Sequence, residues 1–355
     1  MNKALLVVSL FVHDMKAPLA VIDSDAKKIC AAMDRRGSVN RARALPDLVL
    51  VKKKQAQALL NQILVMDAAP AQPGVGGGWA GRLIGLFSGR RKKMEKAPRD
   101  LPSAVTLLKN SLAEQRDLIQ AMQTKIGPDD IGSHGAAVLK RMRRNARTAL
   151  HFADNALALL EPDRPGPAPA PTTVADIIRP AMIEVFDLLD TDISEAARTT
   201  RTLPALVNIL AVKQVFLDID ESLWQARMDC EAEKITQVLV NLMLNAFKFR
   251  TETIRVTAVS ESQERLRFCV SDDGKGIAEK DQPFIFKNRF QVKSSKQFPV
   301  RGHGIGLAGA QALLEGIGGR LELDSSPGRL TCFCAVLESV EWARPPGAAS
   351  DPEDP

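Results

Sequence analysis

The stretch Phe11-Val12-His13-Asp14-Met15-Lys16-Ala17-Pro18-Leu19 sets a carboxylate beside a histidine and a proline five residues after it. Apolar residues around it recur at alternating steps of four and three, the heptad spacing of helices packed in a bundle. They are Val8, Val12, Met15, Leu19, Ile22, Ala26, Ile29 and Met33. His13 lies one residue off this seam, so we expect it to face solvent. Because Pro18 cannot donate to the carbonyl of Asp14, the helix is expected to loosen or bend after the histidine.

The composition is that of an ordinary soluble protein. The chain has 355 residues, 45% hydrophobic and 25% charged, which is enough for two or three domains. The net charge of +6 is modest, and its basic clusters at 90–93 and 141–147 lack interleaved aromatic residues, so no nucleic-acid partner is expected. The apolar run 4–12 is too short to span a bilayer and lacks a cleavage site, so we expect a cytoplasmic protein.

The cysteines form no CxxC pair and no Cys/His ligand set. They are Cys30, Cys230, Cys269, Cys332 and Cys334. Cys332 and Cys334 alternate along an expected strand and so point the same way. We expect buried free thiols in a reducing cytoplasm.

Helical periodicity dominates residues 1–161. The expected helices are Val8–Arg36, Leu45–Asp67, Pro102–Ile126 and Ala136–Glu161. The third has a seam interrupted by Gln115, and the fourth is rich in alanine, which suits close packing. One pair of helices has too little apolar face to be stable alone, so we expect a homodimer in which the N-terminal helices of two copies form a four-helix bundle.

Residues 70–100 are expected to be a flexible, glycine-rich insert. Within it an apolar patch precedes four basic residues at 90–93; its members are Trp79, Leu83, Ile84, Leu86 and Phe87. Two alternatives stay open for residues 79–93: peripheral contact with an anionic membrane surface, or a solvated loop. The glycines at 81, 85 and 89 argue against a firm helix and favour the loop.

A proline-rich linker at 162–171 divides the chain. Beyond it, residues 172–340 mix helices with strands, which predicts an α+β sandwich with helices on one side of antiparallel strands. The expected helices are Val174–Leu189, Glu231–Phe249 and Gly304–Ile317, and the expected strands are Val215–Asp220, Thr253–Val259, Arg265–Ser271, Arg320–Ser325 and Leu330–Glu338. Residues 190–212 are left unassigned, and the tail 341–355 is expected to be disordered.

Three polar motifs interrupt this domain. Asn241, Asn245 and Lys248 fall on one face of the helix within Glu231–Phe249, at spacings of four and three. Asparagine rarely benefits a helix interior, so amides and a lysine on one edge suggest a phosphate and metal site, against the alternative of a merely solvated face.

The second and third motifs are rich in glycine. Asp272-Asp273-Gly274-Lys275-Gly276 ends a strand on a carboxylate that can accept a hydrogen bond from an exocyclic amine such as that of adenine. Gly302-His303-Gly304-Ile305-Gly306-Leu307 opens a helix whose N-terminal amides suit phosphate, without the spacing of a Rossmann fingerprint or a P-loop. Between them lie the cations Lys287, Lys293, Lys296 and Arg301, which could cover a triphosphate.

Together these motifs resemble a sensor histidine kinase of the two-component type. The stretch Phe11–Leu19 resembles the H-box of that family, Asn241–Phe249 its N-box, Asp272–Gly276 its G1 box, Phe284–Phe290 its F-box and Gly302–Leu307 its G2 box. Thr331 followed by Phe333 fits the strand pair at the adenine pocket. The resemblance implies helical dimerisation and phosphoacceptor helices followed by a Bergerat-type ATP-binding domain, with a lid at about 281–303.

The resemblance also implies roles for individual residues. His13 would attack the γ-phosphate of ATP, and Asp14 would orient or accept the imidazole proton. Asn245 would coordinate Mg²⁺, with Asn241 and Lys248 on the phosphates. Asp272 would bind the adenine amine, and the remaining contacts would come from Gly274, Gly276, Gly302, Gly304, Gly306, Leu307 and Thr331. The phosphoryl group would pass to an aspartate in the receiver domain of a separate response regulator.

The chain departs from the family pattern in three ways. Ala17 stands where many relatives carry a threonine or asparagine that positions water, which predicts weak phosphatase activity towards the regulator. About 100 residues separate the two helices that usually form one short hairpin. Either 37–135 is an insertion into this hairpin, or 45–67 closes it and 101–161 forms a second hairpin. We favour the insertion because 136–161 directly precedes the linker. Third, only twelve residues precede His13 in this sequence, so we expect the signal to enter through the insert or through a partner.

Two other classes of protein compete with this interpretation. One is a scaffold that binds nucleotide as a switch without phosphorylating itself, which His13, Asn245 and Asp272 argue against. The other is an ATPase of the gyrase and mismatch-repair group, which shares the nucleotide fold but lacks an H-box on a bundle helix.

Overall fold

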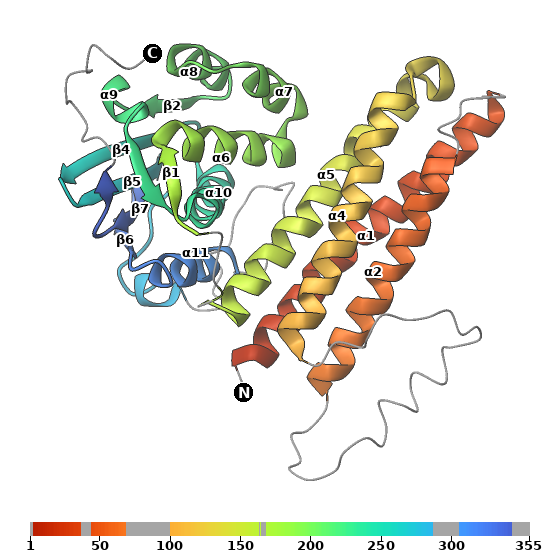
Figure 1. Ribbon diagram of the computed structural model, residues 1–355, viewed down its shortest axis with the longest axis horizontal. Coiled ribbons are helices and arrows are strands. Elements are labelled where there is room, and N and C mark those ends of the chain that lie inside the picture. Colours follow the sequence, from red (N-terminus) through yellow and green to blue (C-terminus); the bar gives the residue numbers. More distant parts are fainter. Residues whose placement is uncertain are drawn as a thin grey trace, which may run out of the picture.

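The computed structural model describes residues 3–36, 44–68, 100–162, 164, 168–286 and 305–342. A long helical bundle lies beside an α+β domain, and the last bundle helix leads into that domain (Figure 1). The predicted fold class, helices followed by a Bergerat-type sandwich, is confirmed. Among the described helices, none is long and apolar enough to cross a membrane. The segment 79–93 lies outside the described residues.

The bundle consists of α1 (Lys3–Arg35), α2 (Ala44–Ala68), α4 (Leu101–Lys125) and α5 (Pro128–Leu160). Each helix packs against two others, so that α1 contacts α2 and α5, and α4 contacts α2 and α5. The α1 seam predicted from the heptad spacing is buried along its whole length from Val8 to Met33. α1 continues through Pro18, which is buried in the bundle, so the proline does not end the helix.

All four helices of the bundle come from one chain, because residues 37–135 contribute α2 and α4, whose apolar seams pack against α1 and α5. The expected bundle in which each of two copies contributes two helices stays a prediction. α1 packs on α5, as an insertion into one hairpin requires, but α1 also packs on α2 and α4 on α5, as two successive hairpins require. The choice between these two divisions of 1–161 therefore stays a prediction as well.

The starts of α4 and α5 are set by local sequence features. α4 begins at an N-cap, where the side chain of Asp100 accepts the N–H of Ser103 at 2.8 Å. α5 begins at Pro128, eight residues before the expected start, and Gly132 with φ of 72° bends its first turn. Only glycine adopts this left-handed conformation without strain, which explains the break in the pattern there.

The α+β domain is built on a five-stranded sheet in the order β2-β4-β5-β7-β6. The strands are β2 (Val215–Asp218), β4 (Ile254–Ser262), β5 (Arg265–Asp272), β6 (Arg320–Ser325) and β7 (Thr331–Leu337). β2 and β4 are parallel, and the other neighbours are antiparallel. Helices α10 (Ala232–Phe249) and α11 (Gly306–Glu315) cover one face of this sheet, and α6 (Val174–Leu189) packs on α10.

Several elements were not expected from the sequence. A second sheet joins β1 (Ala170–Thr173), β3 (Arg227–Cys230) and β8 (Glu341–Trp342). It takes up the end of the expected linker and the first two residues of the expected disordered tail. The unassigned residues 190–212 form α7 (Thr191–Thr199) and α8 (Leu203–Ala211), followed later by α9 (Glu221–Trp224) and the 3₁₀ turn η2 (Gln282–Phe284). Strands this short carry too little periodicity to be read locally.

A buried ionic cluster joins the bundle to the α+β domain. Asp187 of α6 has a side chain that is only 1% exposed, and it forms ion pairs with Arg143 and Arg147 of α5 and Arg198 of α7. Apolar contacts continue across the same junction, since one hydrophobic cluster contains residues of α1, α5 and the α+β core. The two parts therefore share one interior.

Candidate nucleotide and phosphotransfer site

The face of α10 that carries the polar motif points towards the bundle and the glycine-rich segments. Asn241 is buried, while Asn245 and Lys248 are half-buried one and two turns further along. Between Val238 and Phe247 all other residues of the helix are apolar and buried in the core, which explains why these three side chains share one edge. The three side chains therefore lie on one edge of α10, as their spacing of four and three residues predicted.

Asp272 occupies the last inward position of β5. Inward and outward residues alternate along this strand, so the carboxylate continues the apolar series Leu266, Phe268 and Val270 into the core and is only 2% exposed. Burial raises the pKa of Asp272 to about 6, although the N–H of Gly274 donates to its Oδ1 at 3.0 Å. Thr331 lies directly opposite on β7 and is also buried. The structure thus brings these two predicted adenine-pocket residues together.

The two glycines of the same motif are required by close backbone approach. A Cβ at Gly274 would lie 2.5 Å from Asp272 Oδ1 and 2.6 Å from the carbonyl oxygen of Phe249. Gly276 has φ of 72°, and a Cβ there would come within 1.9 Å of the carbonyl oxygen of Ser326. Any side chain at either position would displace the loop that follows β5.

The third motif is described only in part. Gly306 opens α11, and a Cβ there would lie 3.2 Å from Asn241 Oδ1, so the start of this helix meets the polar edge of α10. Leu307 is half-buried beside it. Gly302, Gly304 and the cations Lys287, Lys293, Lys296 and Arg301 lie outside the described residues, as does most of the expected lid.

His13 and Asp14 occupy opposite environments on α1. The His13 side chain is 65% exposed, as its position off the seam predicted, while the Asp14 side chain is fully buried. The His13 Nδ1 and Asp14 Oδ1 atoms are 3.7 Å apart, which is longer than a hydrogen bond but within ion-pair distance.

The charge of Asp14 on the histidine helix acts on Lys248 of α10. Burial lowers the pKa of Lys248, and the charge of Asp14 opposes that shift, which places the carboxylate within electrostatic reach of the lysine. The Lys248 ammonium also lies 5.1 Å from the centre of the Phe249 ring. Residues far apart in the sequence are therefore gathered at one junction.

Sequence reasoning missed a polar chain that ties α10 to α5. Asn241 Nδ2 donates to Asn155 Oδ1 at 2.7 Å, and Asn155 Nδ2 lies 3.0 Å from His151 Nε2. All three side chains are buried, and burial lowers the pKa of His151 to about 4, so its ring is neutral at pH 7. His151 Nδ1 faces Glu184 Oε1 at 4.0 Å. The available signal in the sequence was the pair His151 and Asn155, two polar residues four apart on an alanine-rich helix.

Asp273, the carboxylate next to Asp272, has a structural role. Its side chain accepts the backbone N–H groups of Thr251, Glu252 and Thr253. Burial opposes ionisation, but these three donors outweigh it and hold the pKa of Asp273 below its usual value. It fixes the turn between α10 and β4 that brings the polar edge of α10 to the end of β5.

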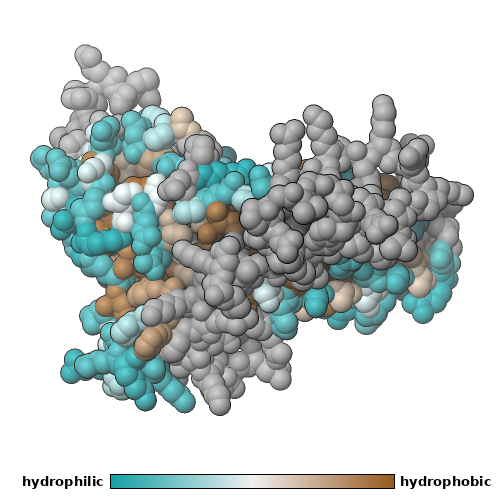
Figure 2. All heavy atoms as spheres, turned by 90° about the horizontal axis from the view of Figure 1, so that it is seen from below, coloured by the Kyte–Doolittle hydropathy of each residue, from teal (hydrophilic) through white to brown (hydrophobic). Residues whose placement is uncertain are grey.

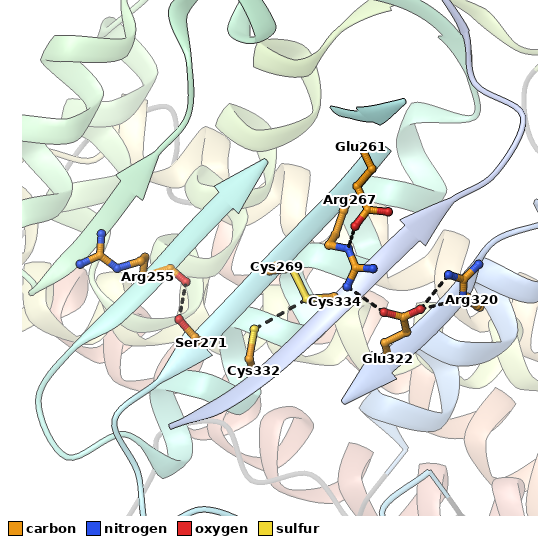
Figure 3. Close-up of a disulfide and its surroundings, with 9 residues drawn as sticks. All are labelled: Arg255, Glu261, Arg267, Cys269, Ser271, Arg320, Glu322, Cys332 and Cys334. Carbon is orange, nitrogen blue, oxygen red and sulfur yellow. Dashed lines mark hydrogen bonds and ion pairs between the residues drawn. A yellow bond between two sulfur atoms is a disulfide. The ribbon is translucent and has the colours of Figure 1, made fainter. Parts of the chain in front are cut away.

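The opposite face of the sheet carries a group of sulfur atoms, and the expectation of buried free thiols is wrong for Cys269 and Cys334, whereas Cys30, Cys230 and Cys332 are free thiols that are half-buried. Cys269 and Cys334 lie opposite each other on β5 and β7 and form a disulfide (Figure 3). Cys332 points to the same side as Cys334, as predicted, with the two sulfurs 3.7 Å apart. Strand register, which local spacing does not encode, decides this pairing.

Comparison with known proteins agrees with this geometry. Residues 230–341 match the family described as histidine kinase-, DNA gyrase B- and HSP90-like ATPase. The chain is 39% identical over 127 residues to the virulence sensor protein BvgS of Bordetella bronchiseptica, covering 33% of this chain and 10% of that protein. It is 29% identical over 226 residues to the adaptive-response sensory kinase SasA of a Nostoc species, covering 62% of this chain and 52% of that one.

Among solved structures, the chain matches full-length ShkA in complex with AMPPNP at 19% identity and a TM-score of 0.44, covering 69% of this chain and 47% of that one. The chain spans about half the length, or less, of these relatives. Residues 230–341 therefore match the family of histidine kinase-, DNA gyrase B- and HSP90-like ATPases, and the chain is similar in sequence to sensor kinases.

Proposed function

We propose that this chain is an ATP-dependent protein-histidine kinase that phosphorylates His13 and passes the phosphoryl group to an aspartate of a separate response regulator. The observation that carries the proposal is that α1, with the exposed His13, and α10, with its polar edge, belong to one hydrophobic core, in which the buried Asp14 lies within electrostatic reach of Lys248. It joins the neighbour of the exposed histidine to the helix that carries the phosphate-binding motif.

The described residues fit ATP as the phosphoryl donor. The Asp272 carboxylate is buried at the end of β5, where it would accept a hydrogen bond from the exocyclic amine of adenine beside Thr331. Asn241 and Lys248 would contact the phosphates. Gly274 and Gly276 shape the loop after β5, and Gly306 and Leu307 begin the helix that faces Asn241. Gly302 and Gly304 belong to the same motif in the sequence and would extend this contact.

Asn245 is the residue that would hold Mg²⁺. Its half-buried amide oxygen is the hard ligand type that this ion prefers, and one protein ligand suffices for an ion that also binds phosphate oxygens and water. Bound there, Mg²⁺ would neutralise negative charge on the phosphates during transfer.

His13 would act as the nucleophile through Nε2. This nitrogen forms a bond to the γ-phosphorus while the bond from that phosphorus to the β–γ bridging oxygen breaks and ADP leaves. Asp14 Oδ1 faces Nδ1 at 3.7 Å, so the carboxylate favours the proton on Nδ1 and stabilises the positive charge that develops on the ring. The high exposure of His13 leaves room first for ATP and then for the regulator.

The reverse reaction is expected to be weak. Ala17 lies one helical turn after His13 and is exposed, but its methyl group cannot hold a water molecule for hydrolysis of a phosphorylated regulator. The chain would therefore serve chiefly as a phosphoryl donor.

Incubation with radiolabelled ATP and Mg²⁺ tests the proposal. We expect acid-labile label on the wild-type chain, none on His13→Gln, and normal label on the control His134→Gln, which removes another exposed helix histidine. Label that survives His13→Gln would contradict the assignment. ATP binding without any label on the wild type would instead favour a nucleotide-dependent switch.

A further inference from the structure

We propose that Cys269, Cys332 and Cys334 form a binding site for one thiophilic metal ion such as Zn²⁺, and that this site exists only while the Cys269–Cys334 disulfide is reduced. The inference does not depend on the kinase function proposed above. It concerns the face of the five-stranded sheet that points away from α10 and α11.

The register of the sheet brings the three sulfur atoms together. Cys269 of β5 lies directly opposite Cys334 of β7, and Cys332 stands two residues before Cys334 on the same face. All three sulfur atoms lie within 4.8 Å of one another (Figure 3). Cys269 and Cys334 are separated by 65 residues in the sequence, so spacing along the chain could not indicate this ligand set.

The positions of the sulfur atoms suit a single ion. A metal–sulfur bond of about 2.3 Å places two thiolates of a tetrahedral site about 3.8 Å apart. The sulfurs of Cys332 and Cys334 already lie 3.7 Å apart. Once the disulfide is open, rotation about the Cα–Cβ bond of Cys269 brings its sulfur to a similar separation from Cys334, because the sheet keeps the two Cα atoms 4.1 Å apart.

The chemistry of the donor atoms selects a soft ion. Thiolates prefer Zn²⁺ and Cu⁺, whereas Mg²⁺ and Ca²⁺ prefer oxygen ligands. Glu322 of β6 lies opposite Cys334, but Arg267 and Arg320 donate to its carboxylate at 2.7 and 2.8 Å. The fourth position is therefore left to water, as in zinc sites that keep one position open.

An ion can reach these sulfur atoms from water. Cys269 and Cys332 are half-buried, and so are their polar neighbours Arg267 and Ser271 on the same face. The surface of the α+β domain is mainly hydrophilic in the view of Figure 2. Cys334 is only 7% exposed, so a bound ion would be partly shielded on the side of that ligand.

The proposed metal site is separate from the residues assigned to ATP. Asp272 and Thr331 belong to the same two strands but point to the opposite face of the sheet, because successive side chains alternate. Asn245, the proposed Mg²⁺ ligand, lies on α10, which covers that opposite face. The two sites would therefore bind different ions on different faces.

The disulfide and the metal ion exclude each other. A dithiol reductant supplies the two electrons and two protons that open the Cys269–Cys334 bond, and it is itself oxidised to a disulfide. The ion then displaces the protons of the three thiols into solvent. In the disulfide form Cys332 is the only thiol left in the group, which is too few ligands for tight binding.

Metal binding to the reduced full chain, without an affinity tag, tests the inference. A phosphine reductant and one water molecule convert the disulfide into two thiols and phosphine oxide, which is removed in the absence of air. Calorimetry with excess Mg²⁺ present should then show one Zn²⁺ bound per chain. Co²⁺ in place of Zn²⁺ should give thiolate-to-cobalt charge-transfer absorption. The chain with its disulfide intact should bind Zn²⁺ at least about a hundredfold more weakly.

Two substitutions separate this site from other thiols. Cys332→Ser keeps the disulfide pair but removes the third sulfur, so Zn²⁺ affinity of the reduced chain should fall at least about a hundredfold. The matched control Cys230→Ser removes a half-buried free thiol of β3 outside the group and should change nothing. Equal Zn²⁺ affinity of the wild type and Cys332→Ser would overturn the inference.

Alkylation of the reduced wild type gives a readout that needs no substitution. Bound Zn²⁺ should protect Cys269, Cys332 and Cys334 from iodoacetamide, as measured by mass spectrometry of the digested chain, while Cys230 reacts at the same rate with and without the ion. Equal alkylation of the three thiols with and without Zn²⁺ would overturn the inference, even if Cys332→Ser fails to fold.

Discussion

At the scale of single residues, two adjacent aspartates have pKa values shifted in opposite directions by their surroundings. Asp272 points into the core, where burial raises its pKa to about 6. Asp273 points out and receives three backbone N–H groups, which keep its pKa low despite partial burial. The Asp272 carboxylate is therefore available for a ligand, whereas the Asp273 carboxylate is held by backbone N–H groups.

This contrast predicts a pH dependence of nucleotide binding. Asp272 accepts the adenine amine only when ionised, so ATP affinity should be constant above pH 7 and fall as the pH drops through about 6, approaching tenfold per pH unit below it. Calorimetric titration from pH 5 to 8 measures this.

The variant Asp272→Asn provides the comparison. It should bind ATP about ten to a hundredfold more weakly at pH 7.5, the cost of losing a charged hydrogen bond, and its pH profile should be flat. A wild-type profile as flat as that of the variant would contradict the role of Asp272. The free energy of unfolding should depend on pH in the opposite sense to ATP affinity. The folded state binds the Asp272 proton more tightly than the unfolded state, so the folded state loses stability as pH rises from about 4 to 6.

At the scale of secondary-structure elements, α5 serves two partners. One side packs into the bundle through Ala146, Ala149, Ala153 and Ala156, while Asn155 bonds to Asn241 of α10. Gly309 allows α11 to approach, since a Cβ there would lie 3.3 Å from Asn155 Oδ1. The helix that ends the bundle therefore holds a residue assigned to phosphate binding.

We predict that Asn155→Ala increases ATP affinity. On the proposed role of Asn241, its bond to Asn155 must break before the amide reaches phosphate, and such a bond contributes about 0.5–1.5 kcal/mol, or roughly two- to tenfold in affinity. The matched control is Asn145→Ala on the same helix, whose amide bonds only to the Arg141 carbonyl of its own helix among the contacts described. Calorimetry should detect no change for the control, and unchanged or weaker binding for Asn155→Ala would argue against this prediction.

At the scale of the whole molecule, the buried carboxylate of Asp187 links the helical bundle to the α+β domain through several arginines. Asp187 is enclosed by Arg143, Arg147 and Arg198, and the Arg143 side chain is itself only 5% exposed. Burial lowers the pKa of Arg147 to about 9, with further contributions from the neighbouring arginines. The single carboxylate of Asp187 therefore compensates the positive charge of three arginines.

Asp187→Asn should therefore destabilise the full chain by about 3–5 kcal/mol, because it leaves buried arginines without their counter-charge. The control Asp192→Asn breaks an exposed ion pair with Lys140 across the same junction and should cost less than about 1 kcal/mol. Urea unfolding measures both. Equal effects of the two substitutions would contradict the importance assigned to burial.

Local patterns were enough to predict the longer elements and to single out the motif residues. Heptad spacing predicted the buried seam of α1 and the exposure of His13, and strand alternation with the following glycines identified Asp272. Side-chain periodicity is a property of neighbouring residues, so it is present in the sequence itself. The sequence by itself determined the long helices, the strands of the five-stranded sheet and the faces that they bury, but not short elements such as β1, β3, α7 and α8.

Only the tertiary structure decided which elements meet. Four helices of one chain pack together, Asn155 bonds to Asn241, and Cys269 pairs with Cys334. Each of these contacts joins residues distant in sequence, and spacing within an element carries no information about its partner. An apolar seam is satisfied equally by a second copy or by an inserted helix, because hydrophobic burial is non-directional. That is why the seams predicted a helical bundle, while only the folded chain shows that α2 and α4 pack against α1 and α5.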